Sequence, residues 1–187
     1  MIASLPLNNK IKLMKTSINY LIALLLVVSV PAFAQTDQAT TKKIIENQDF
    51  RFVATTALPL SSQEVSAIFY QLNSPNGAGA INLTGSNYDL VVKKDSVVAY
   101  LPFYGRSFSA SMDPNDAGTK FKSKDFKYVK TKRKKGGWNI VITPKDVKDS
   151  QKLTLYVSEN GYATLNVTNN NRQPISFNGY LAENKKK

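Results

Sequence analysis

The sequence of 187 residues contains no cysteine and no histidine. Without these side chains the protein cannot use Ser-His-Asp or Cys-His nucleophilic catalysis, thiol redox chemistry, or the usual zinc ligands. A lipid anchor is disfavoured for the same reason, because lipid attachment at a signal cleavage site needs a cysteine. We therefore expect no cofactor and no metal site, and any catalysis would have to use carboxylate, lysine or tyrosine groups.

Acidic side chains are scarce, with 13 Asp and Glu against 25 Lys and Arg, so the net charge is +12. Glycoside hydrolysis would need a pair of carboxylates. Most of the available carboxylates fall in predicted turns, where Asp is favoured for its local hydrogen bonds. A carboxylate-dependent hydrolase is therefore only the third functional hypothesis. The carboxylates considered for it are Asp89, Asp95, Asp113, Asp116, Asp125, Asp146, Asp149 and Glu159.

The one long apolar run, residues 21–30, is too short to span a membrane, which takes about 20 residues. Lys15 precedes this run and Ala32-Phe33-Ala34 follows it, which matches the parts of a secretory signal peptide. We assign residues 1–34 to the signal peptide, and Met14 is the more natural start of translation within it. The mature protein would be periplasmic or extracellular, and it would keep 22 basic and 13 acidic side chains, a net charge of +9.

The rest of the chain is the size of one domain, large enough to bury a core without disulfides. We divide it into a polar N-terminal segment (35–48), a single β domain (49–182) and a basic tail (183–187). A short amphipathic helix is expected around Ile44-Ile45.

Alternation of apolar and polar residues predicts a series of short strands. The pattern is clearest in Tyr88, Leu90 and Val92, and again in Trp138, Ile140 and Ile142. Strands of this kind need one face covered, and turn residues join most of them as neighbours. The sequence therefore predicts an all-β fold with one short helix, an antiparallel meander of about 8–10 strands that forms a barrel, a flattened barrel or a sandwich.

The breaks in this pattern give the expected element boundaries. Leu58-Pro59 is expected to end the first strand, and Phe121–Arg133 to form one continuous strand closed by a turn at residues 134–137. Ser61–Glu64 fits a capping box, and the apolar residues up to Leu72 follow at helical spacing, so a short helix or alternatively a strand is expected there. We expect the helix to cap one end of the barrel.

Tyr100–Phe108 concentrates four aromatic residues, Pro102, Gly105 and Arg106 in nine positions. Proline cannot donate to a sheet and glycine tolerates positive φ, so the chain should bend here. The bend is either a structural corner, with Arg106 tied to groups of the same domain, or a binding site, because arginine stacks on aromatic rings and forks onto carboxylates. In the second interpretation Phe103, Tyr104, Arg106 and Phe108 line a site for an apolar small molecule.

Lys127–Lys135 contains six cations with Tyr128 inside the run and Trp138 close by. Cations interleaved with aromatic residues can bind single-stranded nucleic acid, but an exported protein would rarely meet it. An anionic envelope component, lipopolysaccharide or an acidic glycan, is the partner expected. The alternative is a solvated hairpin tip whose lysines protect strand edges. The candidate anion-binding residues are Lys130, Lys132, Arg133, Lys134 and Lys135.

The loop Asp113–Gly118 resembles the start of a calcium-binding loop. Ala117 fills a ligand position, however, and Lys124 stands where the bidentate Glu is required. A plain turn is therefore predicted, and a partial surface calcium site completed by residues from elsewhere is the weaker alternative.

Several segments taken together resemble one family. They are Tyr88-Asp89-Leu90, Lys94–Val97, Tyr100–Arg106, Gly136–Ile140, Gly161–Leu165 and Asn171–Ser176. This set is similar to the domain of unknown function 4251 family, exported proteins of Bacteroidota-type bacteria. The resemblance covers nearly all of the mature chain and implies an exported single domain. It implies no activity and no catalytic residue.

Three functional hypotheses follow. The first is an exported, non-enzymatic β domain that binds a ligand or an anionic envelope partner. The second is an envelope-associated structural or interaction protein without a small-molecule site, and the hydrolase is the third.

Overall fold

The structure is a computed structural model that describes residues 36–59, 79–108 and 118–184. Four predicted features lie outside these residues: the signal peptide at 1–34, the helix or strand at 61–72, the first five residues of the calcium-like loop, and the end of the tail at 185–187. The helix found in the described residues is not long and apolar enough to cross a bilayer.

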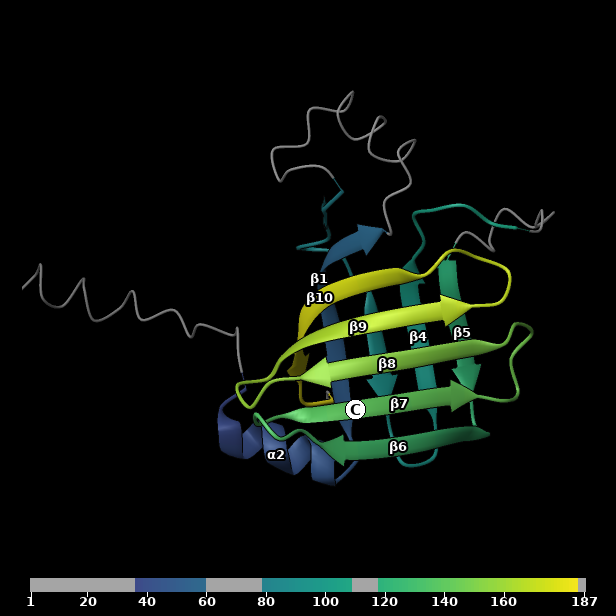
Figure 1. The fold of residues 1–187 in the computed structure, drawn as a ribbon. Helices are drawn as coiled ribbons and strands as arrows, with labels where there is room; N and C mark the ends of the chain where they lie inside the picture. Colours follow the sequence, from purple (N-terminus) through teal and green to yellow (C-terminus); the bar gives the residue numbers. More distant parts are fainter. Residues whose placement is uncertain (1–35, 60–78, 109–117, 185–187) are drawn as a thin grey trace, which may run out of the picture. The chain divides into compact units, whose positions relative to one another are not determined.

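The described residues form one α-helix and ten β-strands, and every strand pairing is antiparallel (Figure 1). The elements are α2 (Gln38–Glu46), β1 (Phe50–Pro59), β2 (Ile81–Asn82), β3 (Asp89–Val92), β4 (Val97–Pro102), β5 (Gly118–Ser123), β6 (Phe126–Lys132), β7 (Trp138–Pro144), β8 (Gln151–Val157), β9 (Tyr162–Asn169) and β10 (Ile175–Ala182).

The strands follow the order β5-β4-β3-β1-β10-β9-β8-β7-β6, and β2 pairs with β1 outside this path. The two strands at the ends of the order, β5 and β6, are joined by only two residues, Lys124 and Asp125. Nine antiparallel strands thus form a nearly closed barrel. The predicted all-β fold with one short helix is confirmed, and among the predicted architectures the barrel is the one formed.

The period-2 pattern in the sequence places apolar side chains inside the barrel. In β7 every second residue is buried, starting with Trp138, and β8 has the same alternation. Phe50, Phe52 and Phe177 are among the largest fully buried side chains. Because these rings come from β1 and β10, the pairing of the first and last strands lies at the centre of the core.

Helix α2 covers one end of the barrel, where the expected helix at Ile44-Ile45 is confirmed. Asp37 caps its N-terminus, because its carboxylate accepts a 2.7 Å hydrogen bond from the Thr40 N–H. Ile44 and Ile45 are buried in the core, while the rest of the helix is largely polar. A helix this short is stabilised mainly by the packing of its apolar face, because intrinsic helix propensity alone is too weak.

One predicted boundary was wrong. Phe121–Arg133 is not one strand but β5 and β6, separated by a turn at Lys124-Asp125 that Asp146 holds in place. The predicted end of the first strand at Leu58-Pro59 is confirmed, because Pro59 is the last residue of β1 and lies opposite Ile175. A proline is tolerated at that position because the strand ends there.

Candidate functional site

The predicted bend after Pro102 is present, since β4 ends at Pro102. The following residues leave β4 and run beside the turn between β9 and β10. The Phe108 N–H donates to the Asn171 carbonyl (2.7 Å), and the Gln173 N–H donates to the Arg106 carbonyl (3.0 Å). The Arg106 N–H in turn donates to Oε1 of Gln173 (3.1 Å). Two segments of the family resemblance, Tyr100–Arg106 and Asn171–Ser176, therefore meet.

Arg172 is the buried cation at this corner, with 8% of its surface exposed. Its Nη1 donates to the Gly118 carbonyl at the start of β5 (2.7 Å), and its guanidinium lies 5.3 Å from the Phe103 ring centroid. The sequence pattern predicted an arginine–aromatic contact here, but at Arg106. Arg172 lies in Asn171–Ser176, one of the segments that carry the family resemblance. No other feature of the sequence pointed to this arginine.

The four predicted ligand-binding residues are close in sequence but differ in exposure. Phe103 and Tyr104 are half-buried and pack against the core. Arg106 is exposed, and Phe108 is 70% exposed. The first two thus contribute to the structural corner, while the other two are at the surface.

A tyrosine cluster lies next to this corner, formed by Tyr100 of β4, by Tyr88 just before β3 and by Tyr104 just after β4. Tyr88 and Tyr100 stack with centroids 5.5 Å apart and an interplanar angle of 24°. Nζ of Lys120 lies 5.2 Å from the Tyr100 centroid. Burial raises the pKa of Tyr104, and the neighbouring Tyr88 raises that pKa further. The cluster was not predicted, because it depends on the register of β3, β4 and β5, in which Tyr100 lies opposite Asp89 and Lys120.

The predicted basic hairpin is formed by β6 and β7. Its tip is closed by the Arg133 N–H, which donates to the Gly137 carbonyl (3.0 Å). The five candidate anion-binding residues are all exposed. Within the described parts of the chain, none of them forms an ion pair with a carboxylate. The guanidinium of Arg133 lies 5.8 Å from the Tyr156 centroid on β8.

The side chains of β6 alternate between the two faces of the sheet. Tyr128 and Lys130 lie opposite Ile142 and Ile140, whose side chains are inside the barrel. The Tyr128 hydroxyl is buried with no hydrogen-bond partner in the described structure, and burial raises its pKa above the ordinary value. Nζ of Lys130 lies 3.5 Å from the Ile45 carbonyl of α2. Lys130 therefore differs from the four cations at the tip, because it also contacts the helix that covers the barrel.

The structure does not bring the aromatic stretch and the basic hairpin together. The aromatic stretch lies beside the end of β9, where Ser107 bridges to Arg172 just after Asn169. The hairpin lies beside the start of β9, because Trp138 is opposite Val157 and Val157 is opposite Ala163. The predicted sites are thus two separate surfaces at opposite ends of one strand.

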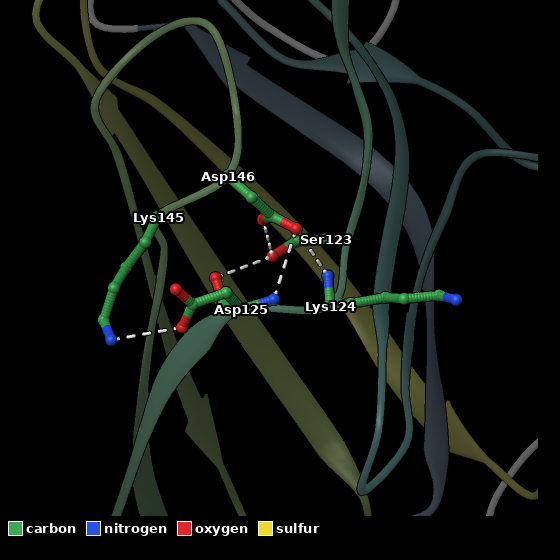
Figure 2. Close-up of polar contacts among 5 residues, drawn as sticks. All are labelled: Ser123, Lys124, Asp125, Lys145 and Asp146. Carbon is green, nitrogen blue, oxygen red and sulfur yellow. Dashed lines mark hydrogen bonds and ion pairs between the residues drawn. The ribbon is translucent and has the colours of Figure 1, made fainter.

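The carboxylate of Asp146 holds the corner between β5 and β6 (Figure 2). It accepts hydrogen bonds from the Ser123 hydroxyl, from the Lys124 N–H (2.9 Å) and from the Asp125 N–H (3.2 Å). The bond from Ser123 above all, and those from the two backbone amides, lower the pKa of Asp146 to about 2. Lys145, the preceding residue, pairs with Asp125 at 3.1 Å. These contacts tie the loop after β7 to the β5–β6 turn.

Other carboxylates considered for a hydrolase also make structural contacts. Asp89 pairs with Arg51 on the neighbouring strand (2.6 Å), and Asp149 accepts a hydrogen bond from Nδ2 of Asn171 (2.9 Å). No group of three or more His, Cys, Asp and Glu side chains that could hold a metal ion occurs among the described residues.

The fold and these surfaces define a small all-β domain with a nearly closed antiparallel barrel. Residues 33–181 match the domain of unknown function DUF4251, so the chain belongs to this family and the resemblance seen in the sequence is confirmed. A crystal structure of a DUF4251 family protein from Bacteroides eggerthii DSM 20697 is similar, with a TM-score of 0.49 and 14% identity over 78% of this chain and 87% of the other. None of the curated proteins matches the chain.

Proposed function

We propose that this protein is an exported, non-enzymatic β domain that binds an anionic component of the cell envelope through its basic hairpin. The observation that carries the proposal is the tip itself, where Lys132, Arg133, Lys134 and Lys135 are consecutive, exposed and without a carboxylate partner in the described structure. An excess of charge of one sign attracts an oppositely charged partner and raises its local concentration.

The hairpin is a defined structure rather than a loose tail. Seven residue pairs join β6 to β7, and the tip turn is closed by a backbone hydrogen bond. The backbone that carries its cations is therefore fixed, which lowers the backbone entropy lost when a partner binds. The signal-peptide pattern supports the choice of partner, because lipopolysaccharide and acidic glycans are the anions that an exported protein meets.

The test compares two variants with equal loss of charge. In the first, Lys132, Arg133, Lys134 and Lys135 are replaced by Ser. In the matched control, four exposed lysines elsewhere are replaced by Ser: Lys93, Lys94, Lys148 and Lys152. We expect the wild type and the control to bind lipopolysaccharide or polygalacturonate, with binding that weakens as salt is raised because exposed charges are screened beyond about 10 Å at 0.1 M. Equal binding by both variants would show that the hairpin only protects a strand edge.

A second candidate is favoured by Phe108, whose large ring is 70% exposed beside Arg106. An apolar small molecule would contact Phe108 and Arg106, with Phe103 and Tyr104 behind them. Mass spectrometry of molecules that copurify with wild type but not with Phe108→Ser would support this candidate. If the same molecules copurify with both proteins, the small-molecule site is contradicted. A structural or interaction role without such a site is then the alternative to anion binding.

A further inference from the structure

Positive charge is concentrated in one short part of the chain. Residues 118–135 contain nine cations and a single carboxylate, a net charge of +8. Residues 35–187 as a whole carry +9. The remainder of the domain is therefore almost neutral, and the excess charge belongs to β5, β6 and the turns that follow them. The cationic segment is longer than the hairpin that the sequence pattern singled out.

This segment, which we call the cationic edge (residues 118–135), contains the two outermost strands of the sheet order. From their common corner β5 and β6 run in different directions (Figure 1). Lys120 and Lys122 are exposed on β5, and Lys127 and Lys132 are exposed on β6. The single carboxylate, Asp125, is paired with Lys145 from outside the segment. The seven residues of β6 alone span about 20 Å, so the cations form a path rather than a point.

An exposed aromatic ring lies beside a cation at each end of this path. On the β5 side, Lys120 lies over the ring of Tyr100, which is 44% exposed. On the β6 side, Arg133 lies over the ring of Tyr156, which is 38% exposed. A tyrosine offers an apolar ring and a polar hydroxyl at the same surface, which suits a ligand that carries both apolar ring faces and hydroxyl groups.

We propose that the cationic edge binds a linear acidic polysaccharide, whose carboxylates or sulfates meet the lysines while its sugar rings contact Tyr100 and Tyr156. The proposal rests on the proposed function and names the chemical class of its partner. The cations favour a partner that is a polyanion. The two exposed tyrosines favour a polyanion whose repeating units are sugar rings. Protection of strand edges would account for a few lysines but not for the cation–tyrosine pair at each end.

The first experiment measures binding of polygalacturonate oligomers of increasing length. We expect affinity to rise with length until the oligomer spans both strands, because a short oligomer contacts only part of the path. Polyphosphate chains of equal charge should bind more weakly, since they have no rings to place on the tyrosines. Vesicles of anionic phospholipid should also bind more weakly than the long oligomer. Equal binding of polyphosphate, or tighter binding of the vesicles, would overturn the polysaccharide assignment.

Variants test the two parts of the path that lie outside the hairpin. Lys120→Gln with Lys122→Gln should weaken polygalacturonate binding roughly threefold to tenfold, whereas Lys148→Gln with Lys152→Gln should not. Tyr100→Ala and Tyr156→Ala should weaken polygalacturonate binding and leave polyphosphate binding nearly unchanged. Tyr180→Ala is the control, because Tyr180 lies on β10, which β9 separates from β8 and which β1 and β3 separate from β4.

The outcomes separate this inference from the proposed function. If the hairpin variant loses polyanion binding while the β5 and tyrosine variants bind like wild type, the proposed function stands and the polysaccharide path is wrong. If no anion binds in a salt-dependent manner that needs the hairpin, the proposed function fails and the inference fails with it.

Discussion

Arg172 is a cation inside the domain, and its contacts join two distant parts of the chain. It donates to the Gly118 carbonyl and lies over the Phe103 ring. Arg172→Met keeps much of the volume but leaves a carbonyl without this donor, which costs about 1–3 kcal/mol. We expect the free energy of unfolding in denaturant to fall by that amount. Arg106→Met, at an exposed neighbour, should cost less; an equal cost would show that Arg172 has no special role.

Asp146 makes the free energy of unfolding depend on pH in the acid range. Its hydrogen bonds lower the pKa to about 2 from 3.8, so the folded state binds the proton less readily than the unfolded state. The stabilisation is complete above about pH 4 and is lost as the pH falls toward 2. Asp146→Asn should therefore show a smaller loss of stability between pH 4 and pH 2. The hydrogen bond from the Thr40 amide lowers the pKa of Asp37 too, so part of the acid sensitivity should remain. Identical pH profiles would contradict the assignment.

Residue contacts of this kind are the part of the site that the sequence did not reveal. Arg106 stands among aromatic residues in sequence, while Arg172 reaches Phe103 only because the β9–β10 turn folds beside β4. The Tyr88–Tyr100 stack likewise needs the pairing of β3 with β4. Proximity in sequence pointed to Arg106 and not to the contact between Arg172 and Phe103, because spatial neighbours are set by strand register.

At the scale of single elements, the hairpin tip depends on Gly137. Its φ is +77°, and a Cβ there would lie 2.1 Å from the Val157 carbonyl oxygen. At Gly136, where φ is +85°, the atoms nearest to a Cβ would belong to the flexible side chain of Glu159. Both alanine substitutions put a side chain into a left-handed conformation, at about 1–2 kcal/mol.

Gly137→Ala should therefore lower the melting temperature more than Gly136→Ala, because backbone atoms of β8 would have to move. The measurement is thermal unfolding of both variants in the same buffer. A larger effect at Gly136 would mean that the tip relaxes away from β8, and the hairpin would then be less rigid than the binding proposal assumes.

Most strands could be predicted from the sequence because one face of each is buried, and a buried face leaves a period of two. The turn at Lys124-Asp125 was missed for a physical reason. It contains neither glycine nor proline, and apolar residues recur on both sides of it at Phe121 and Phe126. The carboxylate that stabilises the turn belongs to Asp146, after the next hairpin.

At the scale of the whole molecule, the property to test is the cellular location of the protein. The signal-peptide pattern predicts cleavage after Ala34. N-terminal sequencing of the protein from the envelope fraction or the medium should begin at Gln35. Replacing Ala32 and Ala34 by Glu should block processing, because the cleavage site requires small residues. A full-length product that stays in the cytoplasm would contradict export.

The fold class was predictable because composition and periodicity are properties of the whole chain. The separation of the two candidate surfaces was not, since the sequence gives no order for the strands around a barrel. Only that order places the aromatic stretch and the basic hairpin at opposite ends of β9. It also makes β5 and β6 the outermost strands, which extends the cationic edge beyond the hairpin.

The pairing of β1 with β10 has a consequence for the way the chain folds. Arg51 lies opposite Ala182, so the first long strand finds one of its partners only when nearly the whole chain is present. Contacts so distant in sequence slow folding, because the entropy of closing a long loop is lost before the contact forms. If the chain is exported as we propose, a polypeptide still emerging from a translocation channel cannot complete this barrel. Its assembly would then wait for release of the C-terminal strand, and until that release the neighbouring strands would expose edges open to aggregation or to a chaperone.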